Sequence, residues 1–446
     1  MSASPPSLDS ESGMIAAGLA SIAAASPPAL QHFTLENGLS VYLREDHGMP
    51  LVAAQLWYHV GTRHEPPGHS NLSHLLEHLM FSGSRKLAPG QYSRAVARLG
   101  GKANATTRND ATAFDIVLPA TRLPIALEMM ADAMAHATLG RDAFEREIKA
   151  IEDERRLKLD NSWYLQSLDQ HHRLAHEGSP YAEPTFGHPV DLNEMQWASV
   201  HTWYRTWYVP NNATLVVVGA VDLQSLRQQV KACFAGIPRS ALPAPQPLRQ
   251  PVEWRERSQT LVRPDLRGGL HLSFNVPSQA TAQSPQVSCA LRLLCEVLGK
   301  GFSSRLYGNL VRDRQLLRGL VIDYQHLCHG DTLLTLSATT GNATPQEAAQ
   351  AIREIIEDLR RTPLPDEVLE HAKLRLLARQ LYTRDSNAWQ AEQIGQAAAI
   401  GLDPSLLDRE PELLRSLTSS MVRQIASQYL QRERSTATYL LQGAGA

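Results

Sequence analysis

The chain has 446 residues, of which 43% are apolar, and its 43 basic and 45 acidic side chains give a formal net charge of −2. That length exceeds what one hydrophobic core usually serves, so two domains are expected. The near-neutral charge offers no basic surface for nucleic acid, and no apolar run is long enough for a membrane span.

The N-terminus is rich in Ser, Ala and Pro, so we expect a disordered segment over residues 1–30. Its apolar stretch, Met14–Ala25, is similar to the core of a signal peptide. However, no Lys or Arg precedes that stretch, and Asp9 and Glu11 do. A signal peptide is therefore not expected, which favours a cytoplasmic protein over a periplasmic one.

Three strands are expected next. Asn37-Gly38 predicts a two-residue hairpin turn between a strand that contains Phe33 and a return strand over Leu39–Leu43. A third strand is expected over Leu51–Val60. The following loop, residues 61–68, leads to the stretch that carries the chemistry.

An apolar stripe between Leu72 and Met80 predicts a helix that is buried on one side. His74 and His78 lie at i and i+4 of this helix, so both imidazoles leave from one face and can bind one zinc ion. Glu77 can reach a water on that ion without being a ligand, and can act as its general base. The order H-x-x-E-H is a known zinc peptidase signature.

A catalytic zinc site usually has a third protein ligand. Candidates lie on a helix expected over Asp142–Leu159, with Asp142 as its N-cap. A solvated acidic helix is the alternative interpretation, and spacing alone does not choose among its glutamates. They are Glu145, Glu147, Glu152 and Glu154.

Further strands and helices complete the first part of the chain, and a proline-rich linker over residues 237–252 follows. We expect strands at Ala103–Thr107, Thr112–Leu118 and Ala213–Gly219, and helices at 90–99, Thr121–Ala137, Trp163–His176 and Leu223–Phe234, with another helix beginning at Asp191.

The order of elements then repeats, which indicates an internal duplication. Expected strands are Leu270–Val276, Leu320–His326, Thr332–Thr339 and Thr436–Leu441. Expected helices are Val287–Leu298, Ser303–Leu316, Pro345–Arg361, Pro365–Tyr382, Asn387–Ile400 and Met421–Leu430.

The fold class predicted from this order is α+β, with two duplicated domains that are each an antiparallel sheet with helices packed on one face. The domains are expected at residues 31–236, which carry the zinc motif, and 253–446. The second domain has no His in SCALRLLCEVLGKG, its equivalent of the motif helix, so it is expected to be free of metal.

The stretches HLLEHLMFSGS and EIKAIEDERR together resemble the insulinase or pitrilysin family of zinc metallopeptidases, which includes the mitochondrial processing peptidases. A third shared stretch runs from Gly100 to Thr107 and continues with Asp110 and Thr112. The resemblance extends from about Phe33 to Leu441.

This resemblance implies roles for individual residues. His74, His78 and Glu154 would be the zinc ligands, and Glu77 the general base. Glu147 would be an outer carboxylate that orients the site. An extended peptide would pair with the edge strand beside the zinc, where Asn104 and Ala105 hold the matching positions.

One departure from the family pattern concerns the second domain. Many relatives bind the substrate carbonyl with an Arg and a Tyr seven residues later. Here the matching positions hold Val311 or Arg312, and Arg318 or Gly319. The resemblance therefore implies a companion subunit of the same fold that supplies the Arg and Tyr, with a homodimer as the alternative.

The function expected from these features is a zinc endopeptidase that acts on short or unfolded peptides. One alternative is a non-catalytic structural or assembly subunit of a processing-peptidase-like complex, although inert relatives usually lose the His or Glu that this chain keeps. Another is a structural zinc site in an interaction protein. Such sites favour four protein ligands and Cys, and no Cys lies near the motif.

Overall fold

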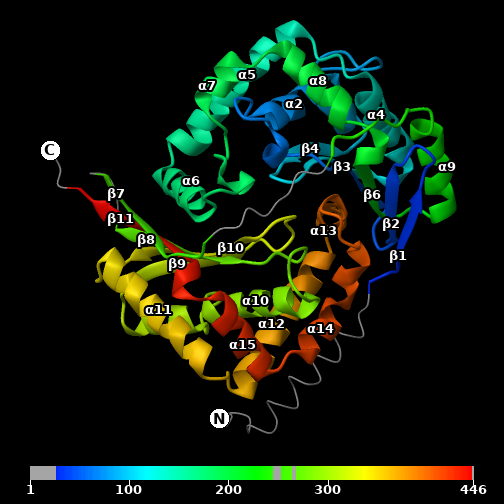
Figure 1. Ribbon diagram of the computed structural model, residues 1–446. Coiled ribbons are helices and arrows are strands. Elements are labelled where there is room, and N and C mark those ends of the chain that lie inside the picture. Colours follow the sequence, from blue (N-terminus) through cyan, green and yellow to red (C-terminus); the bar gives the residue numbers. More distant parts are fainter. Residues whose placement is uncertain (1–26, 245–252, 264–267, 444–446) are drawn as a thin grey trace, which may run out of the picture.

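The computed structural model describes residues 27–244, 253–263 and 268–443, which form two sheet-and-helix halves (Figure 1). We call residues 27–244 the first half and the described residues from 253 onward the second half. Most of the expected disordered segment (residues 1–26) and part of the expected linker (245–252) lie outside the described residues. Within the described residues, no helix is long and apolar enough to cross a membrane.

A six-stranded sheet organises the first half, in the order β1-β2-β6-β3-β5-β4. Every neighbouring pair is antiparallel except β2 and β6, which are parallel. The strands are β1 (Leu30–Thr34), β2 (Ser40–Glu45), β3 (Leu51–Tyr58), β4 (Lys102–Thr107), β5 (Thr112–Pro119) and β6 (Ala213–Gly219).

Helices of the first half cover one face of this sheet and enclose its main core (Figure 1). They are α2 (Leu72–Met80), α3 (Gln91–Arg98), α4 (Leu123–His136), α5 (Arg141–Arg155), α7 (Pro189–Glu194), α8 (Trp197–Trp207) and α9 (Leu223–Phe234). The remaining helix, α6 (Trp163–Ala175), packs on the second half instead. The helix expected over Asp142–Leu159 is α5 followed by a π-helical turn, η3 (Arg156–Asp160). Its N-cap is Gly140, not Asp142.

The expected hairpin at Asn37-Gly38 joins β1 and β2, but its loop is longer than two residues. Thr34 pairs with Ser40, so residues 35–39 form the connection. Gly38 has a positive φ of 92°. The Asn37 amide is buried and donates to Phe234 O (2.8 Å) and Ile237 O (2.9 Å). This long-range anchor, which the local sequence does not reveal, explains the longer loop.

A five-stranded sheet organises the second half, in the order β7-β11-β8-β10-β9. Only β7 and β11 are parallel. The strands are β7 (Arg257–Arg263), β8 (Gly269–Val276), β9 (Leu317–Tyr324), β10 (Thr332–Thr340) and β11 (Ser435–Gln442). The sequence did not predict β7, whose residues are mostly exposed and whose partner β11 is far away in the chain.

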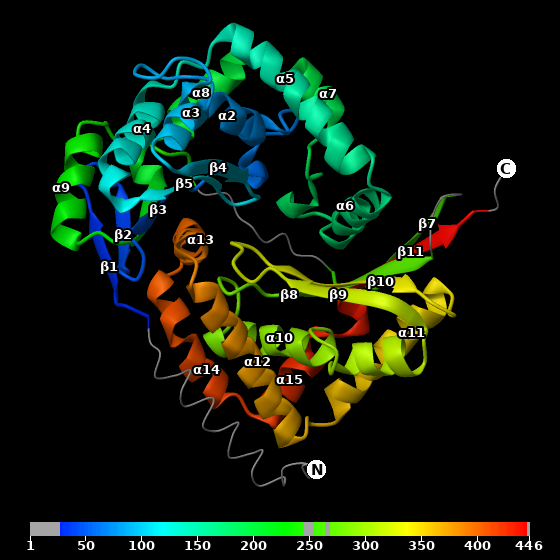
Figure 2. The same cartoon turned by 180° about the vertical axis from the view of Figure 1, so that it is seen from behind.

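The helices of the second half lie on one face of its sheet (Figure 2). They are α10 (Pro285–Leu298), α11 (Pro345–Arg361), α12 (Asp366–Arg384), α14 (Glu410–Ser416) and α15 (Ser419–Tyr429). The remaining helix, α13 (Asn387–Ala399), packs on the first half instead. The helix expected over Ser303–Leu316 is largely a π-helical segment, η6 (Tyr307–Asp313), and α14 was not predicted.

The α+β class and the repeated architecture are as predicted, because the order β2-β6-β3-β5-β4 is repeated as β7-β11-β8-β10-β9. One detail differs from a purely antiparallel sheet. The last strand of each half returns after a series of helices and lies parallel to an early strand: β6 is parallel to β2, and β11 is parallel to β7. Such a long crossover is what a parallel pair requires.

The other face of each sheet is covered by a helix that the opposite half supplies. Helix α13 packs on β3 and β6, and α6 packs on β8 and β11. Both helices follow a serine N-cap, Ser386 and Ser162, whose hydroxyl accepts from the backbone of the third helical residue. The two halves are therefore joined by a reciprocal exchange of helices at equivalent places in the repeat.

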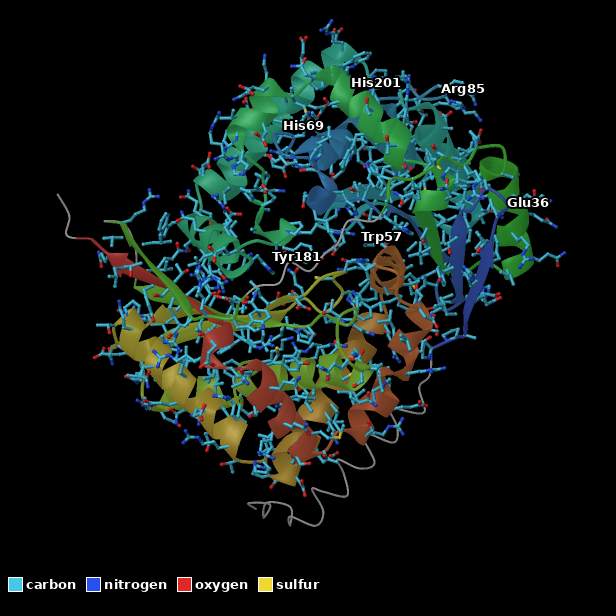
Figure 3. All side chains as sticks on the ribbon, viewed as in Figure 1. Glu36, Trp57, His69, Arg85, Tyr181 and His201 are labelled. Atoms are coloured by element: carbon cyan, nitrogen blue, oxygen red, sulfur yellow. The ribbon has the colours of Figure 1, made fainter. Side chains whose placement is uncertain are left out.

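The two exchanged contacts differ in chemistry. The contact of α13 has an apolar centre, where Ala391 and Ile394 pack against Trp57, which points toward α13 (Figure 3). Hydrogen bonds from Gln55 and Arg44 and an ion pair between Arg108 and Glu392 border this centre. The contact of α6 is polar: His171 bonds Thr438 and Ser273, while Ser167 bonds His271 at 2.9 Å. Both histidines are at most 1% exposed.

Candidate active site

Helix α2 carries the motif and is fixed on two sides. Leu72, Leu75, Leu76 and Leu79 are at most 2% exposed and bury its inner face. At its N-terminus, the Glu65 carboxylate accepts from Asn71 N (3.0 Å) and Ser73 N (2.6 Å). These bonds satisfy amides that have no partner inside the helix, and the ionised form of Glu65 places its charge at the positive end of the helix dipole. Burial raises the pKa of Glu65 to about 7, an effect that the bonds from Ser73 and Asn71 partly offset.

The outer face of α2 presents His74 and His78 to α5, and their side chains converge on one carboxylate oxygen. Glu154 Oε2 lies 3.5 Å from His74 Nε2 and 3.5 Å from His78 Nε2. Within the described ranges, these three residues form the one group of His, Cys, Asp or Glu whose ligand atoms lie within 4.8 Å of one another.

This donor set fits zinc. Tetrahedral ligands about 2.1 Å from a zinc ion are separated from each other by about 3.4 Å, close to the observed spacing. Two imidazoles and one carboxylate are also a ligand combination that catalytic zinc sites use, with the fourth position left open. The arrangement therefore suits a catalytic metal better than a closed structural one.

Outer contacts orient two of these three side chains. Glu147 Oε2 lies 3.0 Å from His78 Nδ1, so Nδ1 carries the proton and Nε2 is free to face the centre. Lys158, on η3, bonds Glu154 Oε1 and leaves Oε2 directed at the histidines. Glu145 and Glu152 are not part of the group, so the structure separates the four candidate glutamates.

The electrostatics of the site follow from burial and from these contacts. Burial, and then the neighbouring His78, lower the pKa of His74 to about 4, which keeps its imidazole neutral. Burial also acts to lower the pKa of His78, but the hydrogen bond to Glu147 and the nearby carboxylates outweigh burial and raise it. For Glu154, burial acts to raise the pKa, but Lys158 and the histidines outweigh burial and lower it.

Glu77 lies beside the ligand group and outside it. Burial raises the pKa of its carboxyl, an effect that a hydrogen bond from Thr107 partly offsets. Thr107 Oγ1 donates to Glu77 Oε2 at 2.6 Å, which fixes one oxygen and leaves the other available. A carboxyl with a raised pKa that is held in one orientation is suited to accept and return a proton.

Strand β4, which contains Asn104 and Ala105, forms the edge of the first sheet. Arg108 N donates to Ala111 O, and hydrogen-bonded pairs alternate along an antiparallel ladder. Counting back through the register, Ala103, Ala105 and Thr107 direct their N–H and C=O groups to the open edge. The Asn104 side chain is exposed, whereas Ala105 packs on the core.

A cavity of about 420 Å³ adjoins the end of β4 and lies between the halves. Its walls come from the β4–β5 turn, α6, β9 and β10. They include Thr107, Tyr164, His172, Tyr181 and Asp323. An extended chain along β4 would therefore reach a space large enough for side chains.

Sequence reasoning missed three contributors to this site. Glu65 lies in the loop before α2, and its position between Val60 and the motif was the only sequence signal that it bonds the N-terminal amides of α2. Thr107 and Lys158 reach the site through the packing of β4 and η3, which no local pattern reveals.

The second half has no comparable centre among its described residues. Helix α10 carries the buried Glu296, which is paired with Arg379 at 3.0 Å. Arg312 is paired with its neighbour Asp313, and Arg318 is exposed on the edge strand β9.

Family models account for both parts of the chain. Residues 40–188 match the insulinase family of peptidases, M16, and residues 195–376 match the inactive domain of the same family. This chain belongs to the insulinase family. The first match contains α2 and α5, with all the candidate ligands, and the match to the inactive domain contains α10.

Relatives in this family extend over most of the chain. The zinc protease PqqE of Helicobacter pylori is 27% identical over 424 residues, which are 93% of each protein. A protein of Bacillus subtilis named as the uncharacterized zinc protease YmxG is 24% identical over 349 residues, which are 77% of this chain and 82% of that protein. A solved protease structure from Helicobacter pylori superposes with a TM-score of 0.86 at 25% identity, covering 93% of this chain and 99% of that one.

Proposed function

We propose that this chain is a zinc-dependent endopeptidase that hydrolyses peptide bonds of short or unfolded peptides. The observation that carries the proposal is the convergence of His74 Nε2, His78 Nε2 and Glu154 Oε2, with the Glu77 carboxylate beside them. The names of the bacterial relatives, which are called zinc proteases, support the same assignment.

Each residue has a separate role in this reaction. His74, His78 and Glu154 hold the ion, and Glu147 fixes the tautomer of His78. When bound, zinc supplies a Lewis acid that polarises a peptide carbonyl and acidifies a water molecule. Glu77 accepts the proton of that water on its free oxygen and delivers it to the amine that leaves. Thr107 holds the other oxygen of Glu77 still during both transfers.

The substrate is held as an added strand. Ala103 and Ala105 offer outward N–H and C=O groups, which pair with any extended backbone whatever its sequence. The backbone of Thr107 instead bonds the Glu77 carboxylate. Because Thr107 contacts Glu77, a peptide on this edge passes directly beside the general base. Most of the backbone of a folded protein is already paired within its own structure, so short or unfolded peptides are the preferred class.

A partner chain completes the site. A companion subunit of the same fold would supply the Arg and Tyr that the second half lacks, and a second copy of this chain is the alternative. One relative is named as subunit beta of the mitochondrial-processing peptidase of Dictyostelium discoideum, at 23% identity over 387 residues.

The test compares Glu77→Gln with Glu145→Gln, an exposed glutamate on α5 that lies outside the ligand group. Both variants should keep one zinc per chain by metal analysis. Cleavage of a mixed peptide library should be lost in Glu77→Gln and kept in Glu145→Gln. If the unmodified chain binds zinc but cleaves nothing, with or without a companion, it is a non-catalytic subunit. A relative named as human cytochrome b-c1 complex subunit 1, 26% identical over 211 residues, is the reason to keep that alternative.

A further inference from the structure

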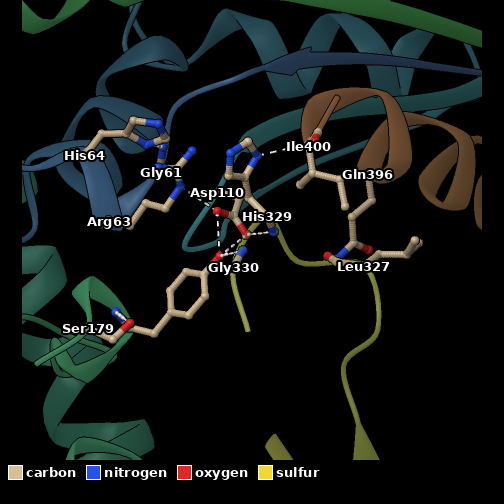
Figure 4. A network of polar contacts seen from close by, with 11 residues as sticks. Gly61, Arg63, His64, Asp110, Ser179, Leu327, His329, Gly330, Gln396 and Ile400 are labelled. Carbon is tan, nitrogen blue, oxygen red and sulfur yellow. Dashed lines mark hydrogen bonds and ion pairs between the residues drawn. The ribbon is translucent and has the colours of Figure 1, made fainter. Parts of the chain in front are cut away.

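A buried carboxylate, Asp110, lies in the turn between β4 and β5 and joins three segments (Figure 4). Arg63 Nε pairs with its Oδ1 at 2.5 Å, and Tyr181 OH donates to its two oxygens at 2.9 Å each. The backbone N–H of His329 donates to Oδ2 at 3.1 Å. Asp110 is only 7% exposed, so these contacts replace water for its charge.

The contact from His329 crosses from one half to the other, and a second contact beside it does the same. His329 and Gly330 follow β9 in the second half, and the Gly330 N–H donates to the Tyr181 hydroxyl at 2.9 Å. The Tyr181 hydroxyl therefore accepts a hydrogen bond from Gly330 of the second half and donates its own hydrogen to Asp110 of the first half. Figure 3 shows Tyr181 between the two halves.

On its other side, the same network reaches the candidate active site. Thr62 N and Arg63 N donate to Arg108 O and Asn109 O, at 3.1 Å each, which ties the segment 61–65 to the end of β4. The same segment ends in Glu65, which bonds the N-terminal amides of α2. Directly before the turn, Thr107 bonds Glu77. Asp110 thus contacts the segment 61–65, which bonds the N-terminus of α2, and follows closely after Thr107, which bonds Glu77.

We propose that Asp110 and Tyr181 are positioning residues through which the second half holds α2 and Glu77 in the geometry for turnover. This inference rests on the proposed peptidase function. It gives the second half a part in catalysis, because the contacts of His329 and Gly330 with Asp110 and Tyr181 complete the support of the general base. Neither residue contacts the ligand atoms, so the metal itself should be retained when the network is cut.

The test is Tyr181→Phe, which removes only the bridging hydroxyl. Its matched control is Tyr324→Phe, because Tyr324 is equally buried at 7% exposed and its hydroxyl donates to Pro277 O within the second half. Tyr181→Phe should lower kcat by about 10-fold to 100-fold, the range typical of residues that orient a metal site, with KM and bound zinc unchanged. Tyr324→Phe should keep kcat, and the two variants should have similar thermal unfolding midpoints.

A double-mutant cycle and hydrogen exchange complete the test. Asp110→Asn should add little to Tyr181→Phe, since both cut the same connection. Amides of α2 and β4 should exchange faster in Tyr181→Phe than in Tyr324→Phe, and this readout does not depend on peptidase activity. Equal kcat and equal exchange in the two Tyr→Phe variants would overturn the inference. If the unmodified chain cleaves no peptide, the proposed function fails, while exchange still decides whether Asp110 and Tyr181 support α2.

Discussion

Gly395 of α13 lies directly against the indole of Trp57, and a Cβ atom at position 395 would overlap with Trp57 Nε1. Trp57 is held in place because its Nε1 donates to Gln55 Oε1 at 3.0 Å, and the Gln55 amide donates to Ala388 O at 3.0 Å. The close approach of α13 to the first sheet therefore requires a residue without a side chain at position 395.

Gly395→Ala is expected to destabilise this contact by about 1–3 kcal/mol, the usual cost of an overpacked core position. Although Ala is the better helix former, the overlap with a fixed indole outweighs that gain. The matched control is Gly236→Ala, where an added Cβ meets nothing within 4 Å. Denaturant unfolding followed by tryptophan fluorescence would measure both, and an unchanged midpoint for Gly395→Ala would contradict the packing argument.

The contact of α6 should respond to pH, whereas that of α13 should not. Burial lowers the pKa of His271 to about 4 and that of His171 well below its usual value near 6.5. Among the described residues, both rings bond only hydroxyl groups, so no carboxylate offsets a proton there. Below pH 6.5, the state in which α6 is packed on the second sheet therefore binds fewer protons than the state in which α6 is detached from it. The stability of the packed state is thus full above pH 6.5 and declines as pH falls toward 4.

Hydrogen exchange, corrected for the intrinsic pH dependence, measures this effect. Amides of α6 should lose protection between pH 6.5 and 4, and amides of α13 should keep theirs. His171→Gln together with His271→Gln should reduce the response of α6, because an amide keeps hydrogen-bonding capacity and does not titrate. Part of the response should remain, since burial also lowers the pKa of His172 and that of His176. Equal pH dependence of α6 and α13 would show that the histidines do not control the contact.

Three glutamates of α5 should differ in their effect on zinc. Glu154→Gln should weaken zinc binding most, because its Oε2 is one of three convergent ligand atoms. Glu147→Gln should have a smaller effect, about 10-fold to 100-fold in affinity or activity, since it acts through His78. Glu152→Gln is the control. Zinc retained after dialysis against a graded chelator gives the order, and loss of zinc from Glu152→Gln alone would mean that Glu154 is not the ligand.

The residues of the site also show what the sequence could predict. His74, Glu77 and His78 share one helix, so local spacing was enough to group them. Glu154 lies on another helix, and only the family resemblance selected it from four glutamates. Thr107 and Lys158 could not be predicted, because their contacts depend on how β4 and η3 pack. The exchange of α6 and α13 was missed for a similar reason: a helix that covers the sheet of the other half has the same local pattern as one that covers its own.

Proline at Ala105 should impair peptide cleavage and leave zinc in place. Ala105 directs its N–H to the open edge of the sheet, so its loss costs no bond to β5 but removes a donor to the substrate strand. Ala105→Ser keeps that N–H and is the control. Peptide kinetics with metal analysis should give a raised KM for Ala105→Pro at normal zinc content. Unchanged kinetics would argue against strand addition at β4.

The chain alone is expected to cleave peptides slowly, and a companion of the same fold should accelerate it. The reason is the second half, which lacks the Arg and Tyr pair: Arg312 is engaged by Asp313, and Arg318 has no Tyr seven residues later. Each missing donor to a developing oxyanion typically costs about 10²–10³ in turnover. Light scattering and peptidase assays on the chain, with and without a coexpressed relative that has no H-x-x-E-H, measure this directly. If the chain forms a fully active homodimer instead, Arg318→Ala should reduce kcat in that dimer, and full activity as a monomer would remove the need for any partner.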